Sequence, residues 1–536
     1  MIDDLIGDDI SSARFASGLD ARFQQMTSHD IRRIESQRLV RGLSLLDATM
    51  IVVGSMIGSG IFIVSAESSR LVGTPGWLLV AWALAGVLTI TGALSCAELA
   101  AMMPRAGGQY VFLRDAYGRP FGFLFGWSLF LVIQTGTIAA VAVAFANFTG
   151  VLLPLVSADN YLIHPHVIGS YGISLSTQQL VAVLMIVVLT FMNTRGLKTG
   201  KLIQNTFTFT KTAALVGLIV IGLTLGWRVG LQHGAAAFSS SWWNPTLNGW
   251  RAGGAQVGFE GVVGNLVALA LAMLLGRAMV GPLFAQSAWN NVTFTGAEVQ
   301  NPGRNLPRAL LIGCAMVVTL YLLANLAYVV TLPLSAIQNA PQNRVATATM
   351  QAILGPAGTM IMAIAIMIST FGCNNGLILA GSRVYYAMAC DNLFFKRVGT
   401  LNAKHVPAIA LITQGVWAAF LTLPRTVTKT VNPTTGAITV NYGNVYTQLL
   451  EYIVSADLVF YALMVAAVVV MRRKAPHLER PYRTLGYPFV PLIYVAIALL
   501  FVLDLGYLAP STSGIGYLIV LTGIPIYFLW QRQART

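Results

Sequence analysis

Three glycines in one apolar stretch are the first residues whose spacing points to chemistry. Gly54, Gly58 and Gly60 lie within GSMIGSGIF, in the middle of a Val- and Ile-rich run over residues 44–69. Glycine costs about 1 kcal/mol relative to alanine inside a helix, so a cluster of three needs a reason. One interpretation is close packing of two helices across Gly54 and Gly58. The other is that the helix unwinds between Ile57 and Gly60, which would free N–H groups for a carboxylate and carbonyls for an ammonium.

A second weak point falls in the apolar stretch 266–296, which contains GPLFAQSAWNN from Gly281 to Asn291. A proline followed by small and polar residues indicates an interrupted membrane helix. Free backbone groups at membrane depth are tolerated only where they are buried in protein or line a cavity. Two interrupted helices at matching places in the two halves of a chain indicate a transporter binding site near the middle of the bilayer.

Lys211 is the most informative ionisable residue. It lies about two turns inside the stretch 203–226, and the run that follows it is almost wholly apolar. A charge at this depth indicates a functional role by default, whereas a snorkelling lysine would only extend its stem toward the surface. Among the other ionisable residues of the apolar stretches, we expect Glu67 and Arg277 to line an outer vestibule, and Asp457 to be paired structurally.

The composition limits the elements that can position these residues. Of 536 residues, 56% are hydrophobic and 10% are charged, whereas a soluble domain carries about 25% charged residues. The same figures exclude intrinsic disorder, which needs low hydrophobicity. The four cysteines show no paired spacing and no histidine partner nearby, so we expect no disulfide framework, no metal site and no cofactor. The net charge of +14 is expected mainly in loops that set membrane orientation, so no nucleic-acid partner is predicted.

Twelve apolar stretches are long enough to span a membrane. We therefore expect an all-α integral membrane protein with 12 transmembrane helices, in which two inverted five-helix repeats, with helices 1 and 6 broken, precede two C-terminal helices. If the N-terminus is inside, 25 of the 33 Lys and Arg residues fall on the inner side, so both termini are predicted to be cytoplasmic. The expected outer loops include 151–176 and 424–446. The expected divisions are a cytoplasmic tail (1–42), a first repeat (43–226), an extracytoplasmic loop (227–265), a second repeat (266–471) and helices 11–12 with the C-terminus (472–536).

From about residue 42 to 530, the sequence resembles the amino acid–polyamine–organocation (APC) transporters. Gly54–Phe62 is similar to their first-helix signature, commonly written G-S/A-x-I-G-S/T-G-I-F. Leu283–Ala285 followed by Trp289–Asn291 looks closest to the L-type amino acid transporter branch. Further segments carry the resemblance, in order along the chain: Glu98-Leu99, Pro104–Tyr110, Ala116–Gly118, Glu298–Pro302, Asn305–Arg308, Ser382–Ala389, Arg480–Arg483 and Gly486–Pro488.

The resemblance implies a site for the backbone of an amino acid at the two interruptions. The N–H groups of Ser59 and Gly60 would bind its carboxylate, and the carbonyls of Met56 and Ala285 its ammonium. Phe284 would cover the occupied site from outside as a gate. The predicted substrate-binding residues are Met56, Ile57, Gly58, Ser59, Gly60, Phe284, Ala285, Ser287 and Asn375.

The resemblance also implies a role for Lys211. Proton-coupled and exchanging members of the family carry a lysine at this place, where it stands in for a sodium ion and bridges the broken first helix to the eighth span, here at Ser369 and Thr370. A fixed positive charge disfavours sodium in the same space. We therefore expect sodium-independent transport, coupled to protons or working by exchange.

The leading interpretation is a secondary transporter of neutral L-amino acids in the cell (inner or plasma) membrane, whose partners are the small-molecule amino acid and the lipid bilayer. The alternatives are a transporter of cationic amino acids or amines and, in another class, a membrane sensor that binds an amino acid without moving it. No acid–base, metal-binding or phosphate-binding cluster supports an enzyme. Residues 151–176 contain no cysteine, so the disulfide-linked heavy subunit of animal L-type transporters is not expected.

Overall fold

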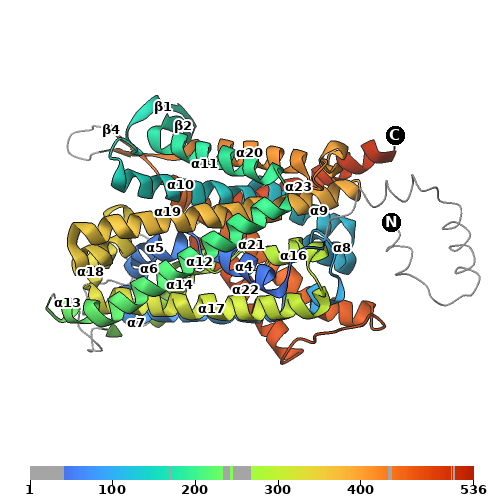
Figure 1. The fold of residues 1–536 in the computed structure, drawn as a ribbon, viewed down its shortest axis with the longest axis horizontal. Coiled ribbons are helices and arrows are strands. Elements are labelled where there is room, and N and C mark those ends of the chain that lie inside the picture. The colour runs from blue at the N-terminus through green and yellow to red at the C-terminus, as the bar shows by residue number, and fades with distance from the viewer. Residues whose placement is uncertain are drawn as a thin grey trace, which may run out of the picture.

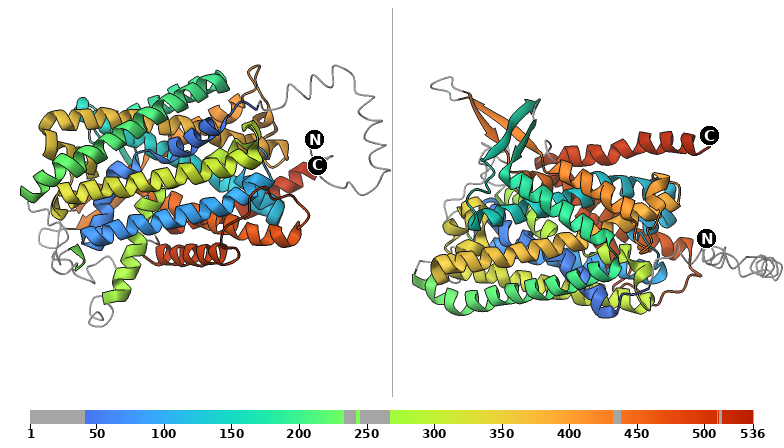
Figure 2. Two further views of the ribbon diagram at one scale, coloured as in Figure 1. Left: turned by 60° about the horizontal axis from the view of Figure 1, so that its bottom comes forward. Right: turned by 45° about the horizontal axis from the view of Figure 1, so that its top comes forward.

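The computed structural model describes residues 41–169, 171–232, 242–244, 267–431, 438–508, 510 and 513–535. The predictions for the tail 1–42 and the loop 227–265 fall largely outside these ranges. Figure 1 shows long helices that run side by side along the longest axis of the molecule. In the left-hand view of Figure 2, helices α7 and α17, from different halves of the chain, lie against one another.

Within the described residues, ten helices are long and apolar enough to span a membrane. Two shorter apolar helices, Ala272–Ala285 and Ala408–Leu421, lie in the sixth and ninth predicted stretches. Every apolar stretch expected from the sequence therefore contains a helix. The helices of the described chain are α4 (Leu45–Met56), α5 (Gly60–Ile63), α6 (Ser65–Val72), α7 (Pro75–Met102), α8 (Gln109–Tyr117), α9 (Arg119–Ser128), α10 (Gln134–Leu152), α11 (Thr177–Thr194), α12 (Leu197–Ile221), α13 (Trp227–Gln232), α14 (Val267–Ala278), α15 (Val280–Ala285), α16 (Asn291–Phe294), α17 (Pro302–Thr331), α18 (Leu334–Gln338), α19 (Val345–Cys390), α20 (Ala408–Leu421), α21 (Val445–Lys474), α22 (Phe489–Leu508) and α23 (Ser513–Arg535).

Local sequence explains where several of these helices begin and bend. Ser44 and Asp47 form a capping box at the start of α4, and the Thr74 side chain caps α7. Helix α19 is bent at Gly355, whose φ of 64° suits a glycine, and Pro356 follows it. These features are local and can be recognised in the sequence.

The fold is not purely helical, which corrects the all-α expectation. Four antiparallel strands form one sheet in the order β1-β2-β3-β4, and they replace the loops expected at 151–176 and 424–446. Thr- and Val-rich runs favour strands, and the pairing of Ile173 with Pro424 joins two hairpins that would each be marginal alone. The right-hand view of Figure 2 shows the sheet standing out from the helix bundle. The strands are β1 (Tyr161–Ile168), β2 (Tyr171–Ser176), β3 (Pro424–Val431) and β4 (Ile438–Tyr442).

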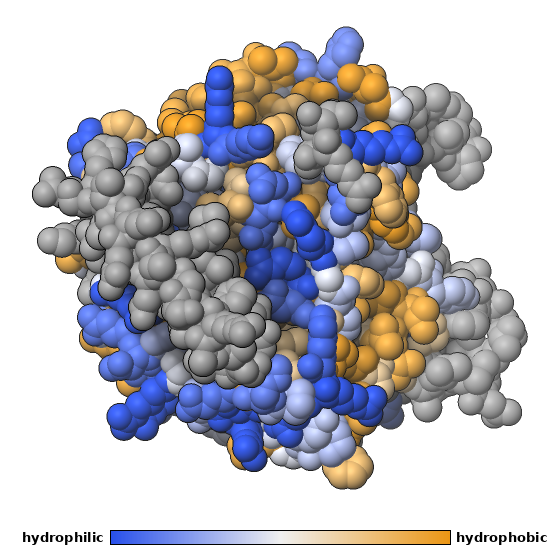
Figure 3. Space-filling view, turned by 90° about the vertical axis from the view of Figure 1, so that its right-hand side faces the viewer, coloured by the Kyte–Doolittle hydropathy of each residue, from blue (hydrophilic) through white to orange (hydrophobic). Residues whose placement is uncertain are grey.

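The sheet and the C-terminus mark opposite ends of the bundle. Figure 1 shows the strands and α18 at one end, here called the sheet end, and α8, α9 and the C-terminus at the other, here called the basic end. Helix α21 finishes with Arg472, Arg473 and Lys474 in its last turn, where cations are favoured by the helix dipole. Figure 3 faces the basic end and shows hydrophilic residues gathered over its middle, with hydrophobic residues toward its edges. A polar end with apolar flanks is the pattern expected of a protein that spans a bilayer.

Candidate functional site

The first apolar stretch is interrupted where its glycines predict. Helix α4 ends at Met56, Ile57 has an extended backbone with φ −73° and ψ 92°, and a helix resumes at Gly60. Ser59 and Val64 on either side of α5 already have helical angles, so the outer half continues through α6. The predicted unwinding between Ile57 and Gly60 is therefore confirmed.

The close-packing interpretation of the same glycines also holds. A side chain at Gly54 would collide with Gln204 and Thr208 of α12. A Cβ at Gly58 would lie 2.9 Å from the Cys373 sulfur of α19. The cluster thus serves two purposes, because it lets α12 and α19 approach α4 closely at the point where that helix ends.

The sixth apolar stretch is interrupted as well. Helix α15 ends at Ala285, α16 begins at Asn291, and Ala288 between them has a φ of 63°. Ser287 Oγ donates to the Phe284 carbonyl at 2.7 Å. This bond satisfies one of the carbonyls that the end of α15 leaves without an intrahelical donor. The second predicted break is therefore confirmed.

Gly60 and Ala285 bring the two interruptions into contact. A Cβ at position 60 would lie 2.6 Å from the Ala285 Cβ and 2.9 Å from the Ala285 Cα, so only a residue without a side chain allows this approach. The start of α5 and the end of α15 are consequently adjacent. Such ends leave N–H and C=O groups, respectively, without intrahelical partners.

Lys211 reaches the first interruption from α12. Its side chain is fully buried, and its ammonium donates to the carbonyl oxygens of Gly54 and, at 2.7 Å, of Ile57. In a continuous helix, both carbonyls would accept from N–H groups one turn later. The ammonium therefore replaces hydrogen bonds that the interruption removes, and the snorkelling interpretation is wrong.

One of the two α19 residues expected beside Lys211 reaches the interruption. Ser369 Oγ lies 3.4 Å from the carbonyl oxygens of Ile57 and Gly58, so it shares the Ile57 carbonyl with Lys211. Thr370 instead donates to carbonyls of its own helix. The Ile57 carbonyl is thus a point at which the broken first helix is linked to both α12 and α19.

Two tyrosines that belong to no motif contact the same region. Tyr321 of α17 donates to the Met56 carbonyl at 2.9 Å, and the Tyr446 hydroxyl of α21 lies 3.0 Å from Ser59 Oγ. The Tyr446 ring also meets Phe284 edge to face, with 6.2 Å between the ring centroids. Tyr321 could be recognised as a phenol inside an apolar stretch, since a buried tyrosine hydroxyl needs a partner. Tyr446 has no such signal, because it is the last residue of the expected loop 424–446.

Beyond Tyr446 the structure is hollowed toward the sheet end. A cavity of about 400 Å³ has Glu67, Arg277 and Glu451 in its wall, which confirms the vestibule expected from the first two residues. Arg277 and Glu451 approach one another to 3.9 Å. A neighbouring cavity of about 230 Å³ is lined partly by Tyr446 itself. Tyr446 therefore contacts Ser59 and the Phe284 ring on one side and a cavity on the other.

Ion pairs hold the basic end together. Arg383 of α19 pairs with Glu298 at 2.9 Å, and both side chains are only 1% exposed. The main-chain oxygen of Glu298 accepts from the N–H groups of Gly42 and Leu43 at 3.0 and 2.9 Å. The start of the described chain is thereby tied to the segment that follows the sixth stretch.

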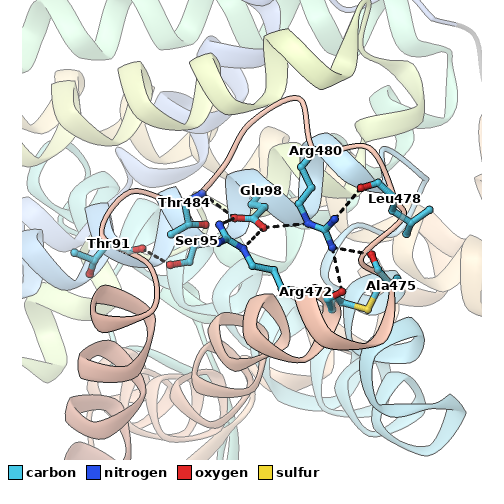
Figure 4. A network of polar contacts seen from close by, with 9 residues as sticks. Thr91, Ser95, Glu98, Arg472, Ala475, Leu478, Arg480 and Thr484 are labelled. Atoms are coloured by element: carbon cyan, nitrogen blue, oxygen red, sulfur yellow. Dashed lines mark hydrogen bonds and ion pairs between the residues drawn. The ribbon is translucent and has the colours of Figure 1, made fainter.

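A second carboxylate at this end, Glu98 of α7, is the centre of the network in Figure 4. It accepts two hydrogen bonds from Arg472 at 2.8 Å each and one from the Thr484 N–H at 2.7 Å. Arg480 approaches it at 3.5 Å. A bidentate arginine–carboxylate pair is directional as well as strong, so this network fixes α7 against the end of α21 and the segment that leads to α22.

Asn375 is engaged by other helices. Asn193 of α11 donates to its side-chain oxygen at 2.8 Å, and its own Nδ2 lies 3.5 Å from Gln204 Oε1 of α12. Gln204 in turn donates to the Met50 carbonyl at 3.2 Å. These contacts belong to the packing of α11 and α12 against α19 and of α12 against α4. Contact between Asn375 and a substrate stays a prediction.

Two interrupted helices that meet, with a buried ammonium at one of them and helices of membrane-spanning length around them, define a membrane transporter. Residues 43–529 match the amino acid permease family. The chain belongs to that family, which is part of the APC superfamily.

Curated relatives are transporters of amino acids. The chain is 30% identical over 501 residues to the large neutral amino acids transporter small subunit 2 of Mus musculus, an alignment that covers 93% of this chain and 83% of the relative. It is 27% identical to the serine/threonine exchanger SteT of Bacillus subtilis, over 92% of this chain and 98% of the relative. It is 28% identical to the b(0,+)-type amino acid transporter 1 of Mus musculus, over 93% and 89% of the two chains. The resemblance to the L-type branch is thus confirmed, and the protein is a multi-pass amino acid transporter.

Proposed function

We propose that the protein is a sodium-independent secondary transporter of neutral L-amino acids that works by alternating access. The observation that carries the proposal is the ammonium of Lys211, which donates to the Gly54 and Ile57 carbonyls at the broken first helix. An amino acid would bind beside it, where α5 begins and α15 ends.

Electrostatics supports independence from sodium. Carbonyl oxygens at the end of a half-helix are the ligands that a transporter offers to a sodium ion. A second monovalent cation about 4 Å from the Lys211 ammonium would be repelled by about 4 kcal/mol at an effective dielectric constant of about 20. That repulsion corresponds to a loss of about a thousandfold in sodium affinity.

The side chains at the interruptions support a neutral substrate. Residues 56–60 and 284–287 include no ionisable side chain, so binding there depends on backbone groups and small hydroxyls. Half-helix ends can neutralise the carboxylate and the ammonium of a zwitterion, but they offer no separate partner for a charged side chain. A cationic amino acid or amine is therefore the less favoured substrate.

Alternating access would use the elements already described. Phe284 and Tyr446 would close the site toward the sheet end, and the Glu298–Arg383 pair would close it toward the basic end. Twelve helices, with inverted repeats over 43–226 and 266–471 and two further helices in 472–536, would supply the two bodies that rock around the site. The basic end would face the cytoplasm with both termini, in the cell membrane, and no disulfide-linked subunit would be needed.

Uptake into proteoliposomes tests this function. Vesicles containing the full chain and preloaded with unlabelled L-leucine or L-serine should take up the same labelled amino acid, at equal rates in sodium and in choline buffer. A panel of the twenty amino acids as competitors would define the substrate class. A requirement for sodium would contradict the role of Lys211, and binding without any uptake would favour a sensor.

A further inference from the structure

Asp457 is a buried carboxyl group in a membrane-spanning helix, and no cation among the described residues pairs with it. It lies in the middle of α21 and is only 6% exposed. In the part of the chain that the structure describes, the ion pairs of Asp and Glu involve other residues, and the cavity beside Asp457 has no Lys, Arg or His in its wall. Among these residues, the structural partner expected for Asp457 is therefore not a cation; its polar neighbour is Tyr461. A buried carboxylate without a partner is very unfavourable. We therefore infer that Asp457 is protonated and neutral in this conformation.

A series of hydrogen bonds leads from the Phe460 carbonyl to Tyr461, the polar neighbour of Asp457. The Phe460 carbonyl can only accept, and Gln109 Nε2 donates to it at 3.1 Å. This contact fixes which end of the Gln109 amide is the nitrogen and which is the oxygen. Gln109 Oε1 then accepts from Asn290 Nδ2 at 2.6 Å. Asn290 Oδ1 consequently faces the Tyr461 hydroxyl, which donates to it at 3.2 Å. Each donor in this series determines the next one.

The single proton of the Tyr461 hydroxyl is used in that series. Its oxygen also has the Ala288 N–H and the Asp457 carboxyl as hydrogen-bond neighbours. An N–H can only donate, so the Tyr461 oxygen accepts from Ala288 and has one lone pair left. Asp457 is therefore a polar neighbour of a hydroxyl that already contacts the interruption. Its burial away from any cation among the described residues is what requires the carboxylic acid.

This acid is connected to the interruption of the sixth stretch. The cavity beside Asp457 has a volume of about 20 Å³ and is lined by Gln286, Ser287 and Trp289 from that interruption. A volume of this size holds one water molecule, which is too little for an amino acid side chain. Trp289 also stacks on Tyr461, with 5.2 Å between the ring centroids. Tyr461 thus contacts three consecutive residues of the break, from Ala288 to Asn290.

We propose that Asp457 binds the proton that drives uptake and releases it when the sixth-stretch interruption moves. In the conformation seen here, its O–H bond is intact and the Tyr461 hydroxyl lies beside it. When movement of residues 286–290 withdraws the Tyr461 oxygen, the O–H bond breaks, the proton passes to water in the adjoining cavity, and a carboxylate remains until the site reopens to the proton source. The proposal rests on the amino acid transport proposed above.

The groups that face Asp457 are compatible with one exchangeable proton. Tyr461 on its own helix and Tyr494 of α22 are the titratable residues in the cavity wall. Cys96 of α7 lies behind Tyr494, and α15 and the break that follows it contribute Leu283, Gln286 and Ser287. Phenols and thiols buried in apolar surroundings keep their protons at neutral pH. Asp457 is consequently the group that can cycle.

Asp457→Asn separates a proton carrier from a structural residue, because asparagine keeps the size and can still donate a hydrogen bond but cannot release a proton. In proteoliposomes in sodium-free buffer, the variant should retain counterflow of labelled L-leucine or L-serine. It should lose accumulation driven by an inwardly directed proton gradient, together with the acidification of the lumen that pyranine reports during wild-type uptake. Asp504→Asn, on α22, is the matched control and should keep all three.

Three results would overturn the proposal or its basis. Gradient-driven accumulation by Asp457→Asn at the wild-type level would show that the residue carries no coupling proton. If that variant does not fold, the wild type alone decides, since counterflow without any lumenal acidification would contradict the inference while leaving amino acid exchange intact. A wild type without counterflow of any amino acid would instead reject the proposed function itself.

Discussion

The two interrupted stretches are stabilised by opposite chemistry. At the first, a buried cation, Lys211, supplies two donors to the Gly54 and Ile57 carbonyls. At the sixth, the neutral Tyr461 hydroxyl donates to the Asn290 side chain of the interruption and lies beside Asp457. Asp457 is an acid without a counter-cation among the described residues. The ammonium has fixed acceptors that need its protons, whereas the carboxyl depends on a contact that movement can break. The comparison teaches that a buried charge can be a permanent part of a site, while a buried neutral acid can be a switch.

Lys211→Met should have the largest effect, because it removes the ammonium that donates to the first interruption in every conformation that the account assumes. The substitution leaves the Gly54 and Ile57 carbonyls without the donor that they share, at a cost of about 1–3 kcal/mol for each buried unsatisfied group. We expect counterflow and gradient-driven uptake to fall together by about a hundredfold.

Reconstituted transport of Lys211→Met, with size-exclusion chromatography as the check on folding, measures this loss. A folded Lys211→Met that exchanges amino acids at the wild-type rate would show that the ammonium is not part of the site.

Gly60→Ala should have an intermediate effect, since it acts where the two interruptions touch. Its new methyl group would lie 2.6 Å from the Ala285 Cβ and push α5 and α15 apart. Overpacking of this kind costs about 1–3 kcal/mol, so we expect transport to fall by about tenfold.

The double variant Gly60→Ala/Ala285→Gly is the matched control for that contact. It removes the Ala285 Cβ that the new methyl group meets first but leaves the Ala285 Cα 2.9 Å away, so it should recover part of the lost counterflow. Equal impairment of the single and double variants would place the defect elsewhere than at the meeting of the two helices.

Tyr461→Phe should have the smallest effect and the most selective one. It keeps the ring that stacks on Trp289 but removes the hydroxyl that links Asn290, Ala288 and Asp457. A hydrogen bond of this kind contributes about 1 kcal/mol, so gradient-driven accumulation should fall about fivefold. Counterflow, measured in the same vesicles, should change little. A parallel loss of both activities would indicate that Tyr461 only supports the fold.

A structural feature could be predicted from the sequence where neighbouring residues determine it, and could not where it depends on contact between distant segments. The break at Ile57–Gly60 follows from three glycines within two turns. The depth of Lys211 follows from the apolar run beyond it, so both could be foreseen. The pairing of β2 with β3 could not, because the two segments are about 250 residues apart and neither shows what it will meet. The same limit applies to the Tyr446 and Tyr461 contacts, whose meaning appears only when α21 is packed against both interruptions.

The measurement that tests the account most directly compares Lys211→Met and Asp457→Asn in two assays, counterflow and proton-driven accumulation, in sodium-free proteoliposomes. A fixed cation and a releasable proton predict different outcomes: Lys211→Met should lose both activities, and Asp457→Asn should lose accumulation while keeping counterflow. The same pattern of loss in the two variants would contradict the division of roles between the two interruptions.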